Sequence, residues 1–300
     1  MAKKPEKPLP VYFDTNIFGD LVDPENPDAV PWLNIIEAKI SEGHIRIIPS
    51  CETIQEILFV LEEDNILCTQ RQKLYRRIVD WLNVLKPADE LLRDDILVFA
   101  QTGKPELPFV RPDHWLWNNL NPIRFGRKLF SKSNLQELYT KQGVFNQGFV
   151  KRVLMRADPE RAKEVRKSIG KSQPGVERQW MTLWQAGGTA QIIARDFAEH
   201  SNVLKECEHR GLDKFLSLPT IRLTIGYILH SWYMQIINKK TNYEPSDAID
   251  SRHATCAGAV GNIVTKDNKL MAAIKHIPGH NITVWSLDEF IRYCEYSSYL

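Results

Sequence analysis

Apolar residues near the front of the chain alternate between short runs and helically spaced positions. An apolar run at residues 10–14 precedes a helix expected near residues 28–42, and a second apolar run follows at 44–48. In residues 51–64, apolar side chains recur at the spacing of one helical face, at Ile54, Ile57, Leu58 and Leu61. This pattern predicts a β-α-β-α opening.

The last part of the chain continues the same alternation. Residues 247–260 have helical spacing, and Gly261 is placed to end that helix. The pattern then predicts a strand, a short helix, a strand and a final helix, at residues 262–265, 269–274, 282–285 and 286–294. Because strands that alternate with helices form parallel sheets, we expect an α/β fold with helices on both faces of a parallel sheet.

The middle of the chain has a different pattern. Residues 88–240 show almost no strand signal, and long amphipathic or apolar segments such as 175–200 and 218–237 indicate helices. We therefore predict one discontinuous α/β domain, formed by residues 1–87 and 241–300 and interrupted by a mostly helical insertion at 88–240.

Composition narrows the class of protein. The 300 residues are 43% hydrophobic and 25% charged, which is typical of a globular protein. No segment reaches the roughly 18 consecutive apolar residues of a membrane helix, and the first ten residues lack an apolar signal region, so we expect a cytoplasmic protein. The five cysteines are scattered without metal-site spacing, which favours reduced thiols.

Positive charge is concentrated within the predicted insertion. Residues 124–171 contain thirteen Lys and Arg against four Asp and Glu, although the whole chain carries a net charge of only +2. Such a segment suits a polyanionic partner such as nucleic acid, and it equally suits a solvated helical face.

Four acidic residues are predicted to meet at one edge of the sheet. Asp14 ends the first strand, and Asp267 closely follows the strand at 262–265. Ligands of open parallel sheets bind outside the carboxyl ends of the strands, so both acids face that crevice. Asp250 opens the helix that enters from the same edge, and Glu56 lies opposite the apolar stripe of its own helix.

A cluster of four carboxylates requires a cation or protonation. Two unit charges about 4 Å apart repel by roughly 4 kcal/mol at an effective dielectric constant near 20. An all-oxygen cluster suits Mg²⁺ or Mn²⁺, and these ions activate water for in-line displacement at phosphorus. The cluster therefore indicates phosphodiester hydrolysis.

Each acid also has a purely structural interpretation. Asp14 and Asp267 are suited to turns, Asp250 to a helix dipole, and Glu56 to solvent. Two assignments stay open, because Glu52 lies one turn before Glu56 and Asp247 nearly one turn before Asp250. We interpret His253, which lies on the apolar stripe of the helix at 247–260, as a packed core histidine.

The two ends of the chain resemble the PIN-domain family of metal-dependent nucleases. The resemblance rests on the ordered set YFDTN, SCETIQEIL, DSRHATCA and IVTKD, and it covers roughly the first 65 and last 55 residues. It implies a three-layer α/β/α fold. It also implies metal binding by four acids and support by three hydrogen-bonding residues, namely Asp14, Glu56, Asp250 and Asp267, with Thr15, Asn16 and Thr265.

The basic insertion supplies the expected substrate contacts. Aromatic residues are interleaved with its cations, at Trp115, Trp117, Phe125, Phe130, Phe145 and Phe149. Most of these rings suit a helical core, and some suit base stacking. We expect RNA to be bound by six cations, namely Lys151, Arg152, Arg156, Arg161, Arg166 and Lys167.

The sequence thus predicts a Mg²⁺- or Mn²⁺-dependent endoribonuclease, with a protein inhibitor or regulator left open. A structure-selective DNA nuclease and a non-catalytic nucleic-acid-binding scaffold are the alternatives. A phosphatase with an aspartyl nucleophile fits less well, because Asn16 stands where that chemistry uses a second acid.

Overall fold

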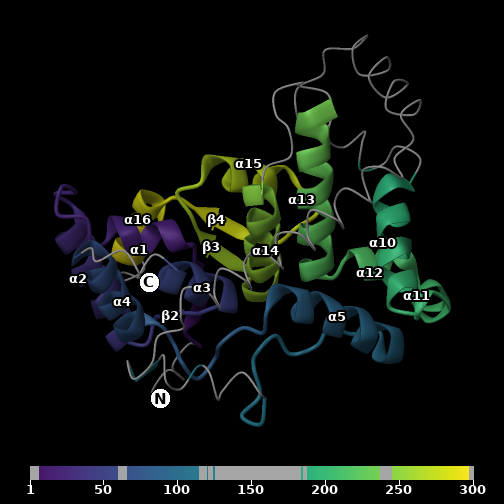
Figure 1. The fold of residues 1–300 in the computed structure, drawn as a ribbon, viewed down its shortest axis with the longest axis horizontal. Coiled ribbons are helices and arrows are strands. Elements are labelled where there is room, and N and C mark those ends of the chain that lie inside the picture. Colours follow the sequence, from purple (N-terminus) through teal and green to yellow (C-terminus); the bar gives the residue numbers. More distant parts are fainter. Residues whose placement is uncertain are drawn as a thin grey trace.

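The structure is a computed structural model, and it describes residues 7–59, 66–114, 120, 124–125, 184, 188–236 and 245–296. Four parallel strands form one sheet in the order β2-β1-β3-β4 (Figure 1). Their bounds are β1 (Leu9–Phe13), β2 (Ile45–Ile47), β3 (Asn262–Val264) and β4 (Thr283–Trp285). Because β1 pairs with both β2 and β3, the first strand of the chain lies beside a strand formed some 250 residues later.

Helices cover both faces of the sheet. Side chains of β1 alternate between the faces, so Val11 and Phe13 join one hydrophobic core and Tyr12 joins the other. The first core is completed by α1 (Thr15–Asp20), α2 (Ala29–Ser41), α3 (Cys51–Phe59), α4 (Ile66–Ile78) and α16 (Leu287–Tyr296). The expectation of an α/β fold with a parallel sheet covered on both faces is therefore confirmed.

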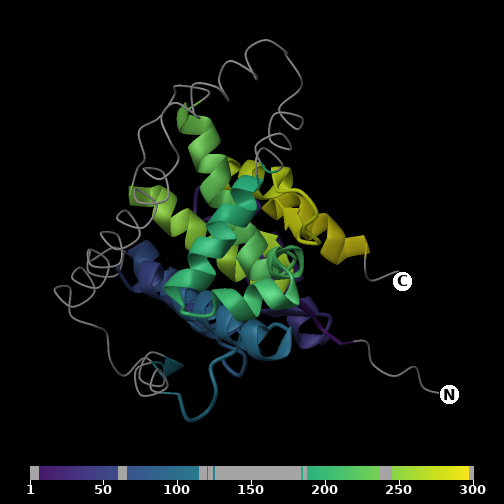
Figure 2. The same cartoon turned by 90° about the vertical axis from the view of Figure 1, so that its right-hand side faces the viewer.

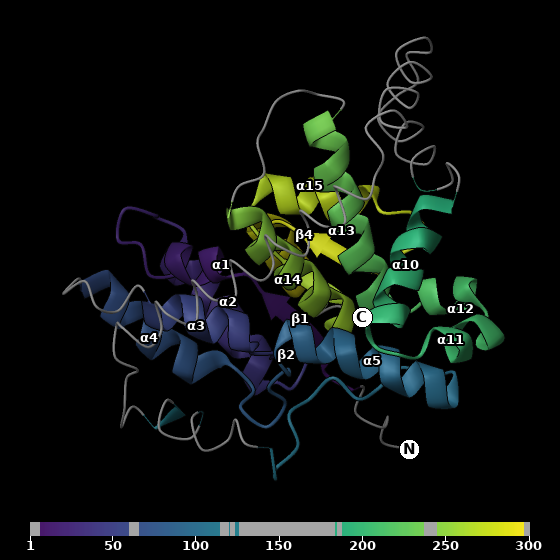
Figure 3. The same cartoon turned by 45° about the vertical axis from the view of Figure 1, so that its right-hand side comes forward.

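The second core joins the sheet to helices of the predicted insertion. It includes Tyr12 and Ile263 of the sheet together with Phe99, Phe197 and Phe215. The helices around it are α5 (Ala88–Thr102), α10 (Thr189–His200), α11 (Leu204–Arg210), α12 (Leu212–Leu216), α13 (Pro219–Ile236), α14 (Pro245–Val260) and α15 (Asn268–His276). Figure 2 shows α10 to α13 gathered on this side of the molecule, and Figure 3 shows α5 reaching from α14 toward α11.

Two glycines let α13 pack closely on its neighbours. A Cβ atom on Gly258 of α14 would lie 2.7 Å from the carbonyl oxygen of Pro219, at the start of α13. A Cβ atom on Gly226 of α13 would lie 2.6 Å from the Ile277 side chain, just after α15. Any larger side chain at either position would push the helices apart, so these contacts fix α13 against α14 and α15.

Two local features of the structure differ from the sequence pattern. A short helix, α1, begins directly after Asp14, and the pattern did not predict it. The helix expected at 247–260 begins at Pro245, so Asp250 lies in its second turn and does not open the helix. Proline suits the first turn of a helix because its missing N–H would have no partner there.

Three further observations concern the cysteines, the lengths of the helices and the basic segment. All five cysteines lie among the described residues, where they are buried and form no disulfide bond. Within the described ranges, none of the helices is both long and apolar enough to cross a membrane. Of the basic segment at 124–171, the structure describes only Arg124 and Phe125, so the six expected RNA contacts lie outside the described residues.

Candidate metal centre

Asp14 lies where the two central strands end. Its backbone N–H donates to the carbonyl of Val264 over 3.0 Å, which places it at the carboxyl edge of β1 and β3. The residue is buried, with 4% of its surface exposed. Oδ1 accepts from the Thr15 N–H over 2.7 Å, and Oδ2 accepts from the Thr265 hydroxyl over 2.7 Å. The Asn16 side-chain amide lies 3.4 Å from the same Oδ2. Of the three residues expected to support the metal-binding acids, Thr15 and Thr265 therefore donate hydrogen bonds to Asp14, and the Asn16 amide lies near it.

Glu56 reaches the same place from α3. Its apolar neighbours Ile54 and Ile57 are buried in the first core, and its own side chain is turned to the sheet edge. The Thr15 hydroxyl donates to Glu56 Oε2, so one threonine binds Asp14 through its backbone and Glu56 through its side chain. Burial acts to raise the pKa of Glu56, but the neighbouring His253 and the Thr15 hydroxyl lower that pKa below its ordinary value.

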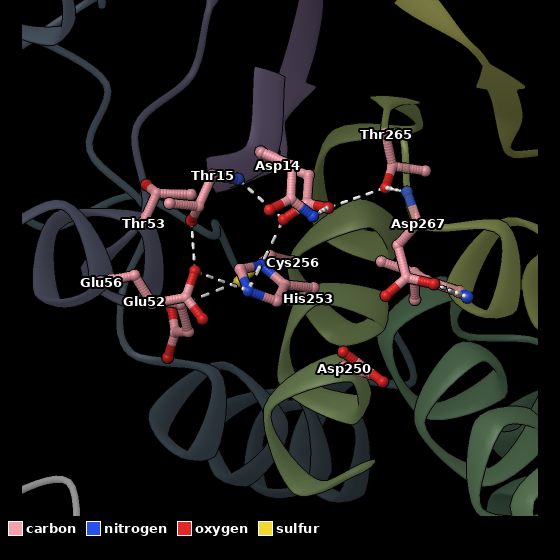
Figure 4. A network of polar contacts seen from close by, with 12 residues as sticks. Asp14, Thr15, Glu52, Thr53, Glu56, Asp250, His253, Cys256, Thr265 and Asp267 are labelled. Atoms are coloured by element: carbon pink, nitrogen blue, oxygen red, sulfur yellow. Dashed lines mark hydrogen bonds and ion pairs between the residues drawn. The ribbon is translucent and has the colours of Figure 1, made fainter. Parts of the chain in front are cut away.

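His253 of α14 lies between the two carboxylates. Its Nε2 atom is 3.2 Å from Glu56 Oε2 and 3.8 Å from Asp14 Oδ1 (Figure 4). Its Nδ1 atom is 2.5 Å from the Tyr12 hydroxyl, which is itself 3.2 Å from Ser50 Oγ. Burial disfavours the charged ring, but the carboxylates of Glu56, Asp14 and Glu52 outweigh burial and raise the pKa of His253 to about 10.

The interpretation of His253 as a packed core histidine was therefore incomplete. The ring is buried, as expected, but both of its nitrogens have polar partners at the sheet edge. A signal for this was present in the sequence: His253 follows Asp250 by three residues, so the two side chains lie on the same side of the helix.

Asp14, Glu56 and His253 have the geometry of a metal site. One ligand atom from each lies within 4.8 Å of the other two, and this is the one such group of three or more His, Cys, Asp or Glu found among the described residues. The expected cluster contained only oxygen ligands. The observed group combines two carboxylates with one imidazole, and imidazole is a ligand that suits transition metals.

Asp267 and Asp250 lie on the other side of the histidine ring from Glu56 (Figure 4). Asp267 caps α15, because its Oδ1 accepts from the N–H groups of Lys269 and Leu270 over 2.7 and 2.9 Å. Its own N–H donates to Thr265 Oγ1 over 3.0 Å. Thr265 therefore connects the backbone of Asp267 to the carboxylate of Asp14.

Asp250 is held by a residue from the predicted insertion. The Tyr227 hydroxyl of α13 donates to Asp250 Oδ2 over 2.9 Å. Burial raises the pKa of Asp250 to about 6, against the opposing effect of this hydrogen bond, and the nearby Asp267 adds to the increase. Asp250 and Asp267 thus interact electrostatically with each other, but neither belongs to the compact group of three ligands.

The structure separates Glu52 from Glu56. Glu52 is 3% exposed and turns away from the group of three, toward Arg252 at 3.3 Å. Its carboxylate also accepts from the N–H of Ala88 over 3.0 Å and from the Cys256 thiol over 3.4 Å. Of the two glutamates, only Glu56 therefore joins the group. The side chain of Asp247 lies outside the described residues, so its comparison with Asp250 stays open.

No protein-family model, no curated protein and no solved structure matches this chain. The assignment of a function therefore rests on the residues of the site and their arrangement.

Proposed function

We propose that this protein is a PIN-like, metal-dependent endoribonuclease. The observation that carries the proposal is the meeting of Asp14, Glu56 and His253 at the carboxyl edge of a parallel sheet, from β1, α3 and α14. Open parallel sheets bind their ligands at this edge. Thr265 links the group to a further acid, Asp267, through two hydrogen bonds.

The donor set fits the proposed ion. Carboxylate oxygens are ligands of both Mg²⁺ and Mn²⁺, and the imidazole of His253 favours Mn²⁺ of the two. Outer hydrogen bonds orient the carboxylates, as ligands of metal sites require: Thr15 and Thr265 donate to Asp14, and Thr15 donates to Glu56. A bound divalent ion supplies an activated water and neutralises charge on the scissile phosphate.

The residues of the chain have three tasks in this proposal. Asp14 and Glu56 hold the ion, and the hydroxyls around them fix their direction. His253 balances their charge when no ion is bound, because its ring is held as a cation between them. Asp250 and Asp267 add negative charge beyond the group of three, and they would stabilise an ion bound there electrostatically.

RNA is the proposed substrate because of the basic segment at 124–171. Neutralising phosphates releases counterions and supplies affinity that does not depend on sequence. We propose that Lys151, Arg152, Arg156, Arg161, Arg166 and Lys167 bind the RNA backbone. We propose that Phe125, in the described part of this segment, stacks on a base. Phe125 is 59% exposed, and the guanidinium of Arg124 lies 5.3 Å from the centroid of its ring.

The proposal is tested by cleavage of labelled single-stranded RNA and DNA with Mg²⁺, with Mn²⁺ and with EDTA. We expect metal-dependent cleavage of RNA, which Asp14→Asn removes. Asp28→Asn is the matched control, because Asp28 is exposed and its side chain caps nothing. Cleavage that persists in Asp14→Asn refutes the site, and cleavage of DNA alone refutes the choice of RNA.

One observation favours a non-catalytic scaffold as the second candidate function. The His253 ring lies 3.2 Å from Glu56 and 3.8 Å from Asp14, and its raised pKa favours the charged form, so the ring offsets part of the negative charge of the site without a metal. A scaffold would bind RNA and cleave neither polymer with either ion. Equilibrium binding of uncleaved RNA together with the cleavage assay separates the two functions.

A further inference from the structure

Tyr227 connects the helical middle of the chain to the acidic site. It lies in α13, and its side chain is 1% exposed. Its hydroxyl donates to Asp250 Oδ2 over 2.9 Å, from a helix that precedes α14 in the chain and packs along it (Figure 1). The resemblance of the chain ends to a nuclease family does not extend to this residue.

The position of the Tyr227 hydroxyl is fixed by its surroundings. The neighbouring Gly226 lets α13 pack against Ile277, and Gly258 lets α14 pack against Pro219, so both helices are closely packed near Tyr227. A tyrosine side chain has only two main torsions, and a buried ring in a packed core keeps both. The hydroxyl is therefore a rigid donor, directed at one oxygen of a half-buried carboxylate.

Such a donor sets the direction of the whole carboxylate. When Oδ2 of Asp250 is held by Tyr227, Oδ1 takes a defined position relative to the charged groups that face Asp250. These groups are Asp267 and Lys269 on α15 and His253 on its own helix. A carboxylate without the donor is able to rotate away from the sheet edge.

We propose that Tyr227 is a positioning residue that holds Asp250 in the orientation needed at the metal centre, so that α13 completes the site. The inference rests on the proposed function, because Asp250 is placed there as part of the nuclease site. It also goes beyond that function, since it makes a helix of the predicted insertion part of the machinery and not only a surface for RNA.

The test compares two tyrosines in different parts of the fold. Tyr227→Phe removes the hydroxyl that donates to Asp250 and keeps the ring. Tyr293→Phe is the control, because Tyr293 lies in α16 and packs its ring on Trp285 and Phe290. We expect Tyr227→Phe to lower kcat on RNA about tenfold with little change in KM, as for loss of one hydrogen bond to a charged group. We expect Tyr293→Phe to leave both values near those of the parent.

A double-mutant cycle shows whether Tyr227 acts through Asp250. Affinity for Mn²⁺ is measured by calorimetry for the parent, Tyr227→Phe, Asp250→Ala and the double variant. We expect Tyr227→Phe to weaken Mn²⁺ binding in the parent and to have no further effect once Asp250 is alanine. Equal effects of Tyr227→Phe in both backgrounds, or no effect in either, overturn the proposal.

The calorimetric cycle keeps this inference separate from the nuclease proposal. If the parent cleaves neither RNA nor DNA, the nuclease proposal fails, and the Mn²⁺ affinities still decide whether Tyr227 positions Asp250. If the parent cleaves RNA and the cycle shows no coupling, the positioning role alone is refuted.

Discussion

Nε2 of His253 lies 3.2 Å from Oε2 of Glu56, and the two residues are 197 positions apart in the chain. Both side chains are held in place by other groups, His253 by the Tyr12 hydroxyl and Glu56 by the Thr15 hydroxyl. The contact joins α3 to α14 at the edge of the sheet. In the metal-free protein, the positive charge beside the two carboxylates therefore comes from the protonated histidine ring. In the proposed nuclease, a bound metal ion would supply that charge.

This ion pair predicts a pH dependence of the stability of the metal-free protein. The pKa of His253 is raised to about 10 in the folded state, against about 6.5 for an ordinary histidine. Between these values only the folded state holds the proton, so the free energy of unfolding decreases as the pH rises through that window. Urea unfolding in EDTA at several pH values from about 7 to about 10 measures the decrease.

His253→Gln supplies the comparison for this measurement. Glutamine keeps hydrogen-bonding groups but does not titrate, so we expect the pH dependence in the same window to become flatter. The ion pair is not the source of the pH dependence if the parent and His253→Gln give parallel curves.

Metal binding is expected to release a proton. A divalent ion that binds Asp14 and Glu56 adds positive charge beside the His253 ring, and an imidazole that ligates the ion must be neutral. Calorimetric titration with Mn²⁺ near pH 7.5, in two buffers of different ionisation enthalpy, gives the number of protons released. We expect about one proton per ion. An apparent enthalpy that is the same in both buffers would show that the ion binds without displacing this proton.

Substitution of Glu52 is expected to lower the stability of the fold, whereas substitution of Glu56 is expected to lower the affinity for Mn²⁺. Glu52→Gln removes one of the two carboxylates that pair with the buried Arg252 at 3.3 Å, the other being Asp89, which is expected to cost about 2 kcal/mol of unfolding free energy. Glu56→Gln is expected to weaken Mn²⁺ binding strongly, because Glu56 is one of the three grouped ligands. Thermal unfolding and Mn²⁺ titration of both variants make the comparison. Equal loss of Mn²⁺ affinity in the two variants would contradict the assignment.

The basic segment is expected to dominate the salt dependence of RNA binding. Reversing Arg161, Arg166 and Lys167 to Glu removes three cations, so the affinity should fall and its dependence on salt should weaken. Fluorescence anisotropy of a labelled RNA at several salt concentrations measures both effects. Superimposed salt titrations of the triple variant and the parent would place the electrostatic contacts elsewhere.

The sheet and two acids of the site could be predicted because their signals are local. Asp14 ends an apolar run, and Glu56 lies off the stripe that contains Ile54 and Ile57, so short segments are enough to place them. The parallel direction of the strands follows from the same local pattern, since alternating strands and helices favour parallel pairing. These are the features for which the structure and the sequence pattern agree.

The rest of the site depends on tertiary partners that no local pattern contains. Glu52 and Glu56 are one turn apart on one helix, and only the position of Arg252 separates them. His253 shares its helical stripe with apolar residues, so its polar contacts become visible only when Glu56 is brought to it. Tyr227 lies in a continuous apolar segment, where periodicity gives no sign of a hydroxyl with a specific acceptor.

The central pairing of β1 with β3 also determines when the site can form during synthesis. Thr265, which binds the carboxylate of Asp14, is made 251 residues after it. Until then the edge of β1 that pairs with β3 has no partner strand. A product that stops before β3 therefore lacks both the central strand pair and the hydroxyl that orients Asp14.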